Sequence, residues 1–210
     1  MQAIRLHRFR LSGHSHRVEL FLSLLNRPVE IVDLLSGGQK DPAFLAMNPF
    51  GQVPVIEDDG VVVADSNAIL VFLAIKHDPA HQWYPLEAKA AAEVQRWLSV
   101  AAGPLFNGPD VARLVGLFDA KHDLARAQAV ASGVFGVMET HLATSGPFFS
   151  GQAPTIADIA LYSYTARAPE GHILLDPYPQ IRDWINRIEA LPGFVPMLRS
   201  QPKFGGPAAQ

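Results

Sequence analysis

The sequence contains no cysteine among its 210 residues. It therefore has no disulfide bond, no cysteine-ligated zinc site and no enzyme thiol that acts as a nucleophile. If this protein takes part in thiol chemistry, the sulfur must arrive with a substrate.

A strong charge of one sign and long apolar runs are also missing. Seventeen Lys and Arg residues stand against 20 Asp and Glu, for a formal net charge of −3, and the basic residues are scattered singly. We therefore expect no nucleic-acid partner, because that binding needs a dense basic surface. No apolar run reaches the roughly 18 residues that span a bilayer, so we expect no membrane insertion. The first residues lack the apolar core of a signal peptide, which favours a cytoplasmic location.

Phosphate-binding and metal-binding motifs are absent as well. The sequence has neither a GxGxxG fingerprint nor a P-loop. His14 and His16 stand two residues apart, but no third or fourth ligand follows at a suitable spacing, so we expect no metal.

The first third of the chain alternates strand and helix patterns. Apolar and polar residues alternate over residues 3–9, as in a half-buried strand, and an apolar helical stripe follows from Val18. A second strand, a short helix, a hairpin with an Asp59-Gly60 turn and a helix capped by Asp65-Ser66 come next. The predicted order is β-α-β-α-β-β-α.

The strand pattern stops near Pro79, and helical stripes take over from residue 86 onward. Gly108 and Pro109 are expected to interrupt them, and the tail after Pro202 is expected to be loose. Strands and helices followed by helices alone favour two packed units. We predict an α/β domain over residues 1–79 and an all-α domain over residues 86–203.

Three local features of the first unit carry candidate chemistry. The first is the turn into the first helix, which places Ser12, His14 and Ser15 at a helix N-terminus, where an anion is stabilised. Taken alone, the pattern is better explained by Ser15 simply capping the helix. The spacing leaves open which of these three side chains would contact such an anion.

The second and third features are a proline segment and an acidic cap. Pro54 leads into a strand, where a proline belongs at an edge or a turn. Asp65-Ser66 puts a carboxylate and a hydroxyl at open helix N–H groups, which suits a ligand with both an ammonium and a carboxylate. Each feature has a plain structural explanation in isolation, and they become informative together.

These segments together resemble the cytosolic glutathione S-transferases, over nearly the whole chain. Residues 9–18 are similar to the catalytic loop of the serine-type, bacterial-like classes, and residues 48–55 to the family's cis-proline segment. Asp65-Ser66 matches the family's glutathione site, and residues 155–158 its Ser/Thr-x-x-Asp capping box. The resemblance implies a thioredoxin-like first domain, a helical second domain and glutathione as co-substrate.

The resemblance also implies roles for individual residues. Ser12 is the expected thiol-activating hydroxyl, although several related classes use a cysteine in this loop. Its hydroxyl would donate a hydrogen bond to the glutathione thiolate and lower the thiol pKa by roughly one to two units. The remaining glutathione contacts are expected from Gln39, Lys40, Gln52, Val53, Pro54, Asp65 and Ser66.

The second substrate is expected in a pocket between the two halves. Its candidate lining residues are Leu11, His14, Phe106 and Arg113, although Arg113 is equally explained as a surface charge and His14 as an exposed loop residue. Trp83, Trp97 and Trp184 are expected to pack rather than bind a ligand.

The resemblance implies a detoxifying transferase that joins glutathione to an electrophilic, mostly apolar small molecule. A glutathione-dependent dehalogenase, isomerase or peroxidase is an alternative, as is a non-catalytic binding or regulatory protein on the same fold. We also expect a homodimer. Phe50 resembles the side chain that some family members insert into the partner subunit; otherwise it packs within its own domain.

Overall fold

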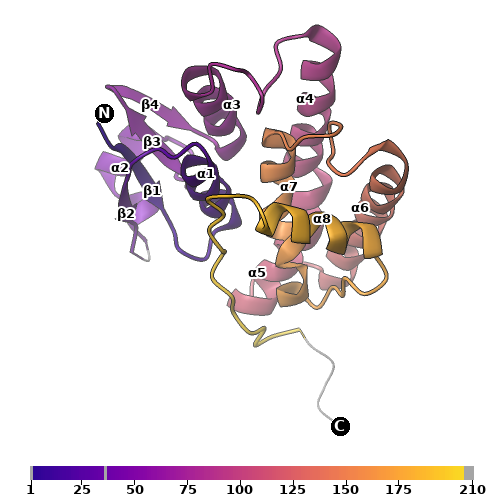
Figure 1. Cartoon of the computed structure of the whole chain (residues 1–210). Helices are drawn as coiled ribbons and strands as arrows, with labels where there is room; N and C mark the ends of the chain where they lie inside the picture. The colour runs from indigo at the N-terminus through magenta and orange to yellow at the C-terminus, as the bar shows by residue number, and fades with distance from the viewer. Residues whose placement is uncertain (1, 36, 206–210) are drawn as a thin grey trace.

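The computed structural model describes residues 2–35 and 37–205, which form a small mixed sheet with three helices beside a larger helical part (Figure 1). The first part contains β1 (Ile4–Arg8), α1 (Gly13–Leu24), β2 (Val29–Asp33), the 3₁₀ turn η1 (Gly38–Lys40), α2 (Pro42–Met47), β3 (Val55–Asp58), β4 (Val61–Ala64) and α3 (Ser66–His77). The second contains α4 (Ala88–Ala102), the π-helical turn η2 (Phe106–Asp110), α5 (Val111–Phe118), α6 (Leu124–Ser145), α7 (Ile156–Ala166), the 3₁₀ turn η3 (Ala168–Gly171) and α8 (Pro179–Glu189). The predicted order of the first part is confirmed. The division of the chain between residues 79 and 86 stays a prediction.

The sheet has the strand order β2-β1-β3-β4. β1 runs parallel to β2 and antiparallel to β3, and β3 forms a hairpin with β4 in which Asp58 pairs with Val61. Asp59 and Gly60 join these strands with φ of 49° and 79°, as a two-residue hairpin turn requires. β3 starts at Val55, just after Pro54, because proline has no N–H to donate to a strand ladder.

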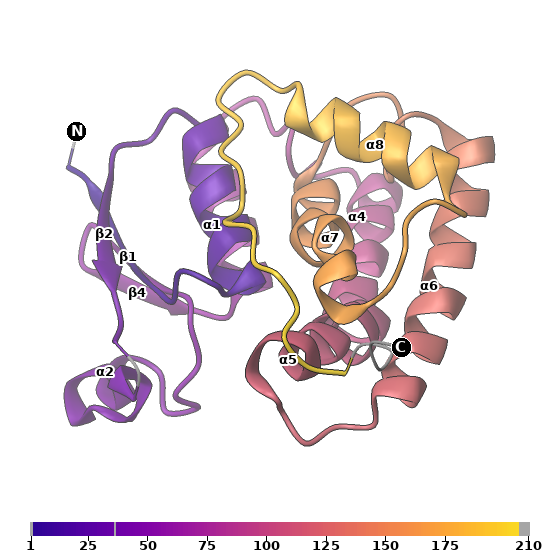
Figure 2. The ribbon, with the colours of Figure 1, turned by 90° about the horizontal axis from the view of Figure 1, so that it is seen from below.

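Helix α1 lies between the sheet and the helical part, where it packs against α3 and α7 (Figure 2). It is therefore buried along more than its apolar stripe, and its polar residues Ser15, His16 and Arg17 are also buried. The start of this helix, with the polar groups that it carries, consequently faces the junction of the two parts.

Side chains cap the helices at the junction. Ser12 is the N-cap of α1, and Thr155 with Asp158 forms the predicted capping box of α7. For α3 the cap is Asp65 alone, whose side chain accepts from the N–H groups of Asn67 and Ala68. Ser66, expected to share this role, is instead the first helical residue.

The second part differs from expectation at Gly108 and Pro109, where a break was predicted. The chain continues there through the π-helical turn η2 directly into α5, a helix that the sequence did not predict. A Cβ at Gly108 would lie 2.8 Å from the backbone nitrogen of Ala131, so this glycine permits the close approach of α6.

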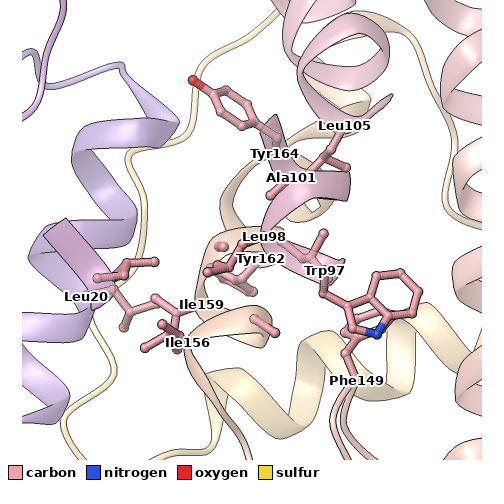
Figure 3. Close-up of a cluster of buried hydrophobic side chains, with 14 of the residues drawn as sticks. Leu20, Trp97, Leu98, Ala101, Leu105, Phe149, Ile156, Ile159, Tyr162 and Tyr164 are labelled. Carbon is pink, nitrogen blue, oxygen red and sulfur yellow. The ribbon is translucent and has the colours of Figure 1, made fainter. Parts of the chain in front are cut away.

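The core of the second part is aromatic and aliphatic, and it reaches α1 through Leu20 (Figure 3). Trp97 and Trp184 are buried within it, and Trp83 packs edge-to-face on Phe21 with ring centroids 5.3 Å apart. The prediction that the tryptophans are packing residues is confirmed. Tyr164 lies at the edge of this cluster, where its ring meets the junction.

After α8 the chain returns across the molecule between α1 and the helical part (Figure 2). The carbonyl of Gly193 accepts a hydrogen bond from the Ser23 hydroxyl, and the carbonyl of Val195 contacts the His16 ring. The N–H groups of Lys203 and Phe204 donate to the carbonyl of Gly116. The expectation of a loose tail is therefore wrong as far as Phe204, and residues 206–210 lie outside the described range.

Among the helices of the described residues, none has the length and apolarity of a membrane span.

Candidate active site

A cavity of about 540 Å³ opens where the first part of the chain meets the helical part. One wall comes from the loops that follow β1, β2 and α2 and from the start of α3. The other comes from the C-terminal end of α4, η2, α5 and α7. Its lining residues include most of the predicted site, namely Leu11, Ser12, His14, Gln39, Gln52, Val53, Pro54, Asp65, Ser66, Phe106 and Arg113.

Ser12 stands at this cavity as the N-cap of α1. Its Oγ accepts a hydrogen bond from the Ser15 N–H at 3.2 Å, and its hydroxyl hydrogen has no acceptor among the described residues. The hydroxyl can therefore donate to an anion held at the positive end of α1. Ser15 is buried and its Oγ accepts from the Phe9 N–H, so of the two serines only Ser12 lines the cavity.

The alternative that His14 is an exposed loop residue is wrong, because His14 lies in the first turn of α1. Its side chain is 25% exposed; Nε2 lies 3.5 Å from Oδ2 of Asp110, and Nδ1 lies 3.2 Å from Oγ of Ser66. Burial, and secondarily the Arg17 charge, hold the pKa of His14 below its ordinary value despite Asp110. Its imidazole is consequently neutral near pH 7.

Asp65 and Ser66 form the polar end of the cavity. Oδ1 of Asp65 accepts from the N–H groups of Asn67 and Ala68 at 2.9 and 3.0 Å, and Asp65 itself has φ of 73°. Ser66 is buried, with its hydroxyl at the cavity wall. A carboxylate and a hydroxyl thus stand together at the N-terminus of α3, as the sequence predicted.

The middle of the cavity is lined by Gln39, Gln52, Val53 and Pro54, and the Val53–Pro54 bond is cis, as the resemblance implied. Lys40 is the exception: it is exposed and is not among the lining residues. Successive residues of a 3₁₀ turn point about 120° apart, so when Gln39 lines the cavity its neighbour faces elsewhere.

Arg113 is buried, so the surface-charge alternative is wrong. Its Nε donates to Glu170 at 2.5 Å and its NH1 to the carbonyl of Leu11 at 2.6 Å. The residue before Ser12 is therefore tied to α5, and Tyr164 adds a second tie because its hydroxyl accepts from the His14 N–H at 3.3 Å. The helical part holds the Ser12 loop from both sides.

The polar lining residues that the sequence analysis did not identify include Arg17, Asp110 and Tyr164. Arg17 had a signal, because it lies four residues before Phe21 on the buried face of α1. Asp110 and Tyr164 had none, because their place at the cavity depends on the packing of distant helices.

Part of the cavity lining is apolar, with residues from both walls. Phe9 faces Phe118 with ring centroids 6.4 Å apart, and Leu11, Leu114 and Phe106 continue this surface. The cavity therefore joins a polar strip, suited to a charged and extended ligand, to an apolar space beside Ser12. Within the described residues, no group of three or more His, Cys, Asp or Glu side chains could hold a metal ion.

Comparison with known proteins gives consistent similarities. The model of "Glutathione S-transferase, N-terminal domain" matches residues 6–81, and that of "Glutathione S-transferase, C-terminal domain" matches residues 121–187. The chain is 31% identical to glutathione S-transferase 3 of Zea mays, covering 92% of each chain, and 29% identical to human glutathione S-transferase theta-2, covering 87% of this chain and 79% of the relative. It is also similar to the crystal structure of a glutathione S-transferase from Pseudomonas fluorescens Pf-5, with a TM-score of 0.86, 34% identity and coverage of 94% and 100% of the two chains.

Proposed function

The chain belongs to the glutathione S-transferase family, and we propose that it joins the sulfur of glutathione to electrophilic, mostly apolar small molecules. The observation that carries this proposal is that two helix N-termini with hydroxyl groups, Ser12 on α1 and Ser66 on α3, line one cavity beside an apolar wall. This arrangement can bind a charged tripeptide along its length while its sulfur points at the apolar space.

In this proposal the tripeptide lies along the polar strip. Asp65 and Ser66 bind the ammonium and carboxylate of its γ-glutamyl end, and the backbone of Val53, next to Pro54, pairs with the cysteinyl part. Gln52 adds a contact. Gln39 and the exposed Lys40 bind the glycine carboxylate.

Ser12 then activates the sulfur. A free thiol has a pKa near 8.5 and is mostly protonated at neutral pH, whereas the thiolate is the nucleophile. The Ser12 hydroxyl donates to the thiolate, and such a hydrogen bond to a charged group is worth about 1.5–3 kcal/mol. The N-terminus of α1 adds to this stabilisation. The thiol proton leaves to solvent, so Ser12 acts as a donor and not as a base.

The chemical step is a nucleophilic attack by the thiolate. With a chlorinated nitroaromatic, the sulfur forms a bond to the ring carbon and chloride departs with the bonding electron pair. The apolar wall of Phe9, Leu11, Phe106 and Phe118 supports an apolar second substrate. Dehalogenase, isomerase and peroxidase activities begin from the same thiolate and are the nearest catalytic alternatives.

The test is glutathione affinity by calorimetry together with conjugation of 1-chloro-2,4-dinitrobenzene. We expect saturable binding and turnover that depends on Ser12. Binding without turnover of this substrate or of haloalkane, enone and peroxide substrates would favour a non-catalytic protein on the same fold. Absence of glutathione binding would refute the proposal itself.

Two further parts of the proposal concern the assembly and the cell. The Phe50 side chain is 86% exposed between α2 and β3, so it does not pack within its own part of the chain. We propose that it inserts into the partner of a homodimer. We also propose a cytoplasmic location and a detoxifying role, because the cytosol keeps thiols reduced and so supplies the co-substrate.

A further inference from the structure

Three side chains of the cavity stand in a row whose combined chemistry the proposed transfer does not use. Oγ of Ser66 lies 3.2 Å from Nδ1 of His14, and Nε2 of His14 lies 3.5 Å from Oδ2 of Asp110. The three residues come from α3, α1 and η2, and all of them line the cavity. The row therefore exists only because distant segments pack together.

The hydrogens along this row follow from its donors and acceptors. A carboxylate only accepts, so Nε2 of His14, which faces Asp110, carries the ring hydrogen and Nδ1 carries the lone pair. NH1 of Arg17 donates to Oγ of Ser66 at 3.3 Å, which leaves the Ser66 hydrogen for Nδ1. The hydroxyl thus donates to a neutral imidazole, since burial holds the pKa of His14 below its ordinary value.

The imidazole of His14 is held in this position before any substrate arrives. Its ring packs edge-to-face on Tyr164 with centroids 5.0 Å apart, and the ring of Phe106 lies 6.0 Å away on the same measure. The Tyr164 hydroxyl also accepts from the His14 N–H at 3.3 Å. A fixed base that reaches a hydroxyl and is oriented by a carboxylate is the arrangement that activates serine as a nucleophile.

We propose that the cavity is also a serine esterase site, in which Ser66 is the nucleophile, His14 its general base and Asp110 the residue that positions His14. The substrates are small carboxylic esters with apolar groups, because the rest of the lining includes Leu11 and Phe106. This activity uses no glutathione and does not depend on the proposed transfer.

The reaction has two balanced steps. Oγ of Ser66 bonds to the ester carbonyl carbon while its proton passes to Nδ1 of His14, and the alcohol leaves with the electron pair of the broken C–O bond and that proton. Water then attacks the acyl group with the same assistance from His14. This second step releases the carboxylic acid and restores the Ser66 hydroxyl.

The negative charge that forms on the ester oxygen is stabilised by Arg17. This side chain is fully buried beside Ser66, its Nε and NH2 have no hydrogen-bond partner, and no carboxylate of the described residues lies within 4.0 Å of it. Its positive charge is therefore not neutralised by a close ion pair. The N–H of Ser66, the first residue of α3, has no acceptor within the helix and can donate to the same oxygen.

The test is hydrolysis of 4-nitrophenyl butanoate without glutathione, together with labelling by an ethoxy fluorophosphonate. Wild type is compared with Ser66→Ala, His14→Gln, Asp110→Asn and Asp110→Glu, after circular dichroism shows that each variant is folded. Ser99→Ala is the matched control, because Ser99 is exposed on α4 and is not a lining residue of the cavity. Release of 4-nitrophenolate is followed by absorbance, and the labelled residue is identified by peptide mass spectrometry.

We expect saturable hydrolysis by wild type and Ser99→Ala, with the phosphonate bonded to Ser66 as its fluoride departs. Ser66→Ala should lose both the hydrolysis and the label. His14→Gln should lower kcat about 10²- to 10⁴-fold, the usual contribution of a general base. Asp110→Asn should lower kcat with KM unchanged, because an amide can donate to His14 and reverse its tautomer, and Asp110→Glu should recover part of kcat.

A label on Ser12 or on any residue other than Ser66, or no label at all, would overturn the inference. Hydrolysis that Ser66→Ala leaves unchanged would do the same. Equal losses of kcat in Asp110→Asn and Asp110→Glu would refute the positioning role of Asp110. Should Ser66→Ala not fold, the site of labelling in the wild type decides alone. Since no assay contains glutathione, failure of this inference and failure of the proposed function are distinguishable.

Discussion

Replacement of Ser12 by alanine is the most direct perturbation of the proposed mechanism. In the structure the Ser12 hydroxyl keeps its hydrogen free while Oγ accepts from the Ser15 N–H at 3.2 Å. If it donates that hydrogen to the thiolate, its removal costs about 1.5–3 kcal/mol. One pKa unit is about 1.36 kcal/mol, so the pKa of bound glutathione should rise by about one to two units.

This shift predicts a specific kinetic pattern. Below the pKa of the bound thiol in the wild type, kcat for 1-chloro-2,4-dinitrobenzene should fall about 10- to 100-fold in Ser12→Ala, in proportion to the lost thiolate. The KM for glutathione should change little, because its charged ends bind elsewhere in the cavity. The thiolate is measured directly from its ultraviolet absorption in the complex as a function of pH, beside the pH profile of kcat.

Ser12 is also a helix cap, so stability must be separated from chemistry. Loss of the cap should lower the unfolding free energy by about 1 kcal/mol, or roughly 2–4 °C in Tm for a chain of this size. Ser12→Asp keeps a capping acceptor and should regain that stability, but its carboxylate should raise the thiol pKa further. Ser15→Ala removes the acceptor of the Phe9 N–H, so it should change stability and leave the thiol pKa unaltered. An unchanged thiol pKa in Ser12→Ala would refute the assigned role.

Three further predictions follow from other contacts. Arg113→Met should lower the unfolding free energy by about 3 kcal/mol, because it removes the closer of two buried cations beside Glu170 and leaves that carboxylate with Arg167 at 3.8 Å and the Ser200 N–H. It should also lower kcat, because the Leu11 carbonyl is released. Denaturant unfolding and steady-state kinetics check the two effects, and a normal kcat in a folded variant would contradict the second. Phe50→Ala should shift the mass in sedimentation from dimer to monomer, and an unchanged dimer would assign the interface elsewhere. Burial lowers the pKa of His16 to about 4, so as the pH falls below about 6.5 the unfolded chain binds this proton while the folded chain does not. The free energy of unfolding should therefore decrease by roughly 3 kcal/mol between about pH 6.5 and pH 4. His16→Gln should flatten this pH dependence when unfolding is measured as a function of pH.

Local patterns predicted the first part of the chain well. The alternation over residues 3–9 became β1, the Asp59-Gly60 pair became the hairpin turn, and the polar residues before α3 and α7 became caps. For α1 the expected cap Ser15 was wrong, because Ser12 is the N-cap and Ser15 lies inside the helix. Each depends on the preferences of residues within a few positions of one another. Asp65-Ser66 was identified for the same reason, although only Asp65 caps the helix.

Predictions that needed the packing of distant segments failed or stayed open. Gly108 and Pro109 read as a break, yet close contact with α6 keeps the chain helical through them. The sequence left two explanations for Arg113, a pocket residue or a surface charge. The structure decides between them, because Arg113 is buried and pairs with Glu170, 57 positions later. No local pattern distinguished Lys40, which is exposed and does not line the cavity, from Gln39, which does.

The sequence by itself determined the order of strands and helices in the first part, the lack of any protein thiol, and the hydroxyl and acidic residues at two helix N-termini. These are properties of composition and short-range periodicity. Only the tertiary structure decided that Ser12, not Ser15, lines the cavity, that Tyr164 reaches the start of α1 across 150 positions, and that Arg17 is buried without a counter-ion among the described residues. Burial and charge pairing depend on which surfaces meet in space, and local sequence does not encode that.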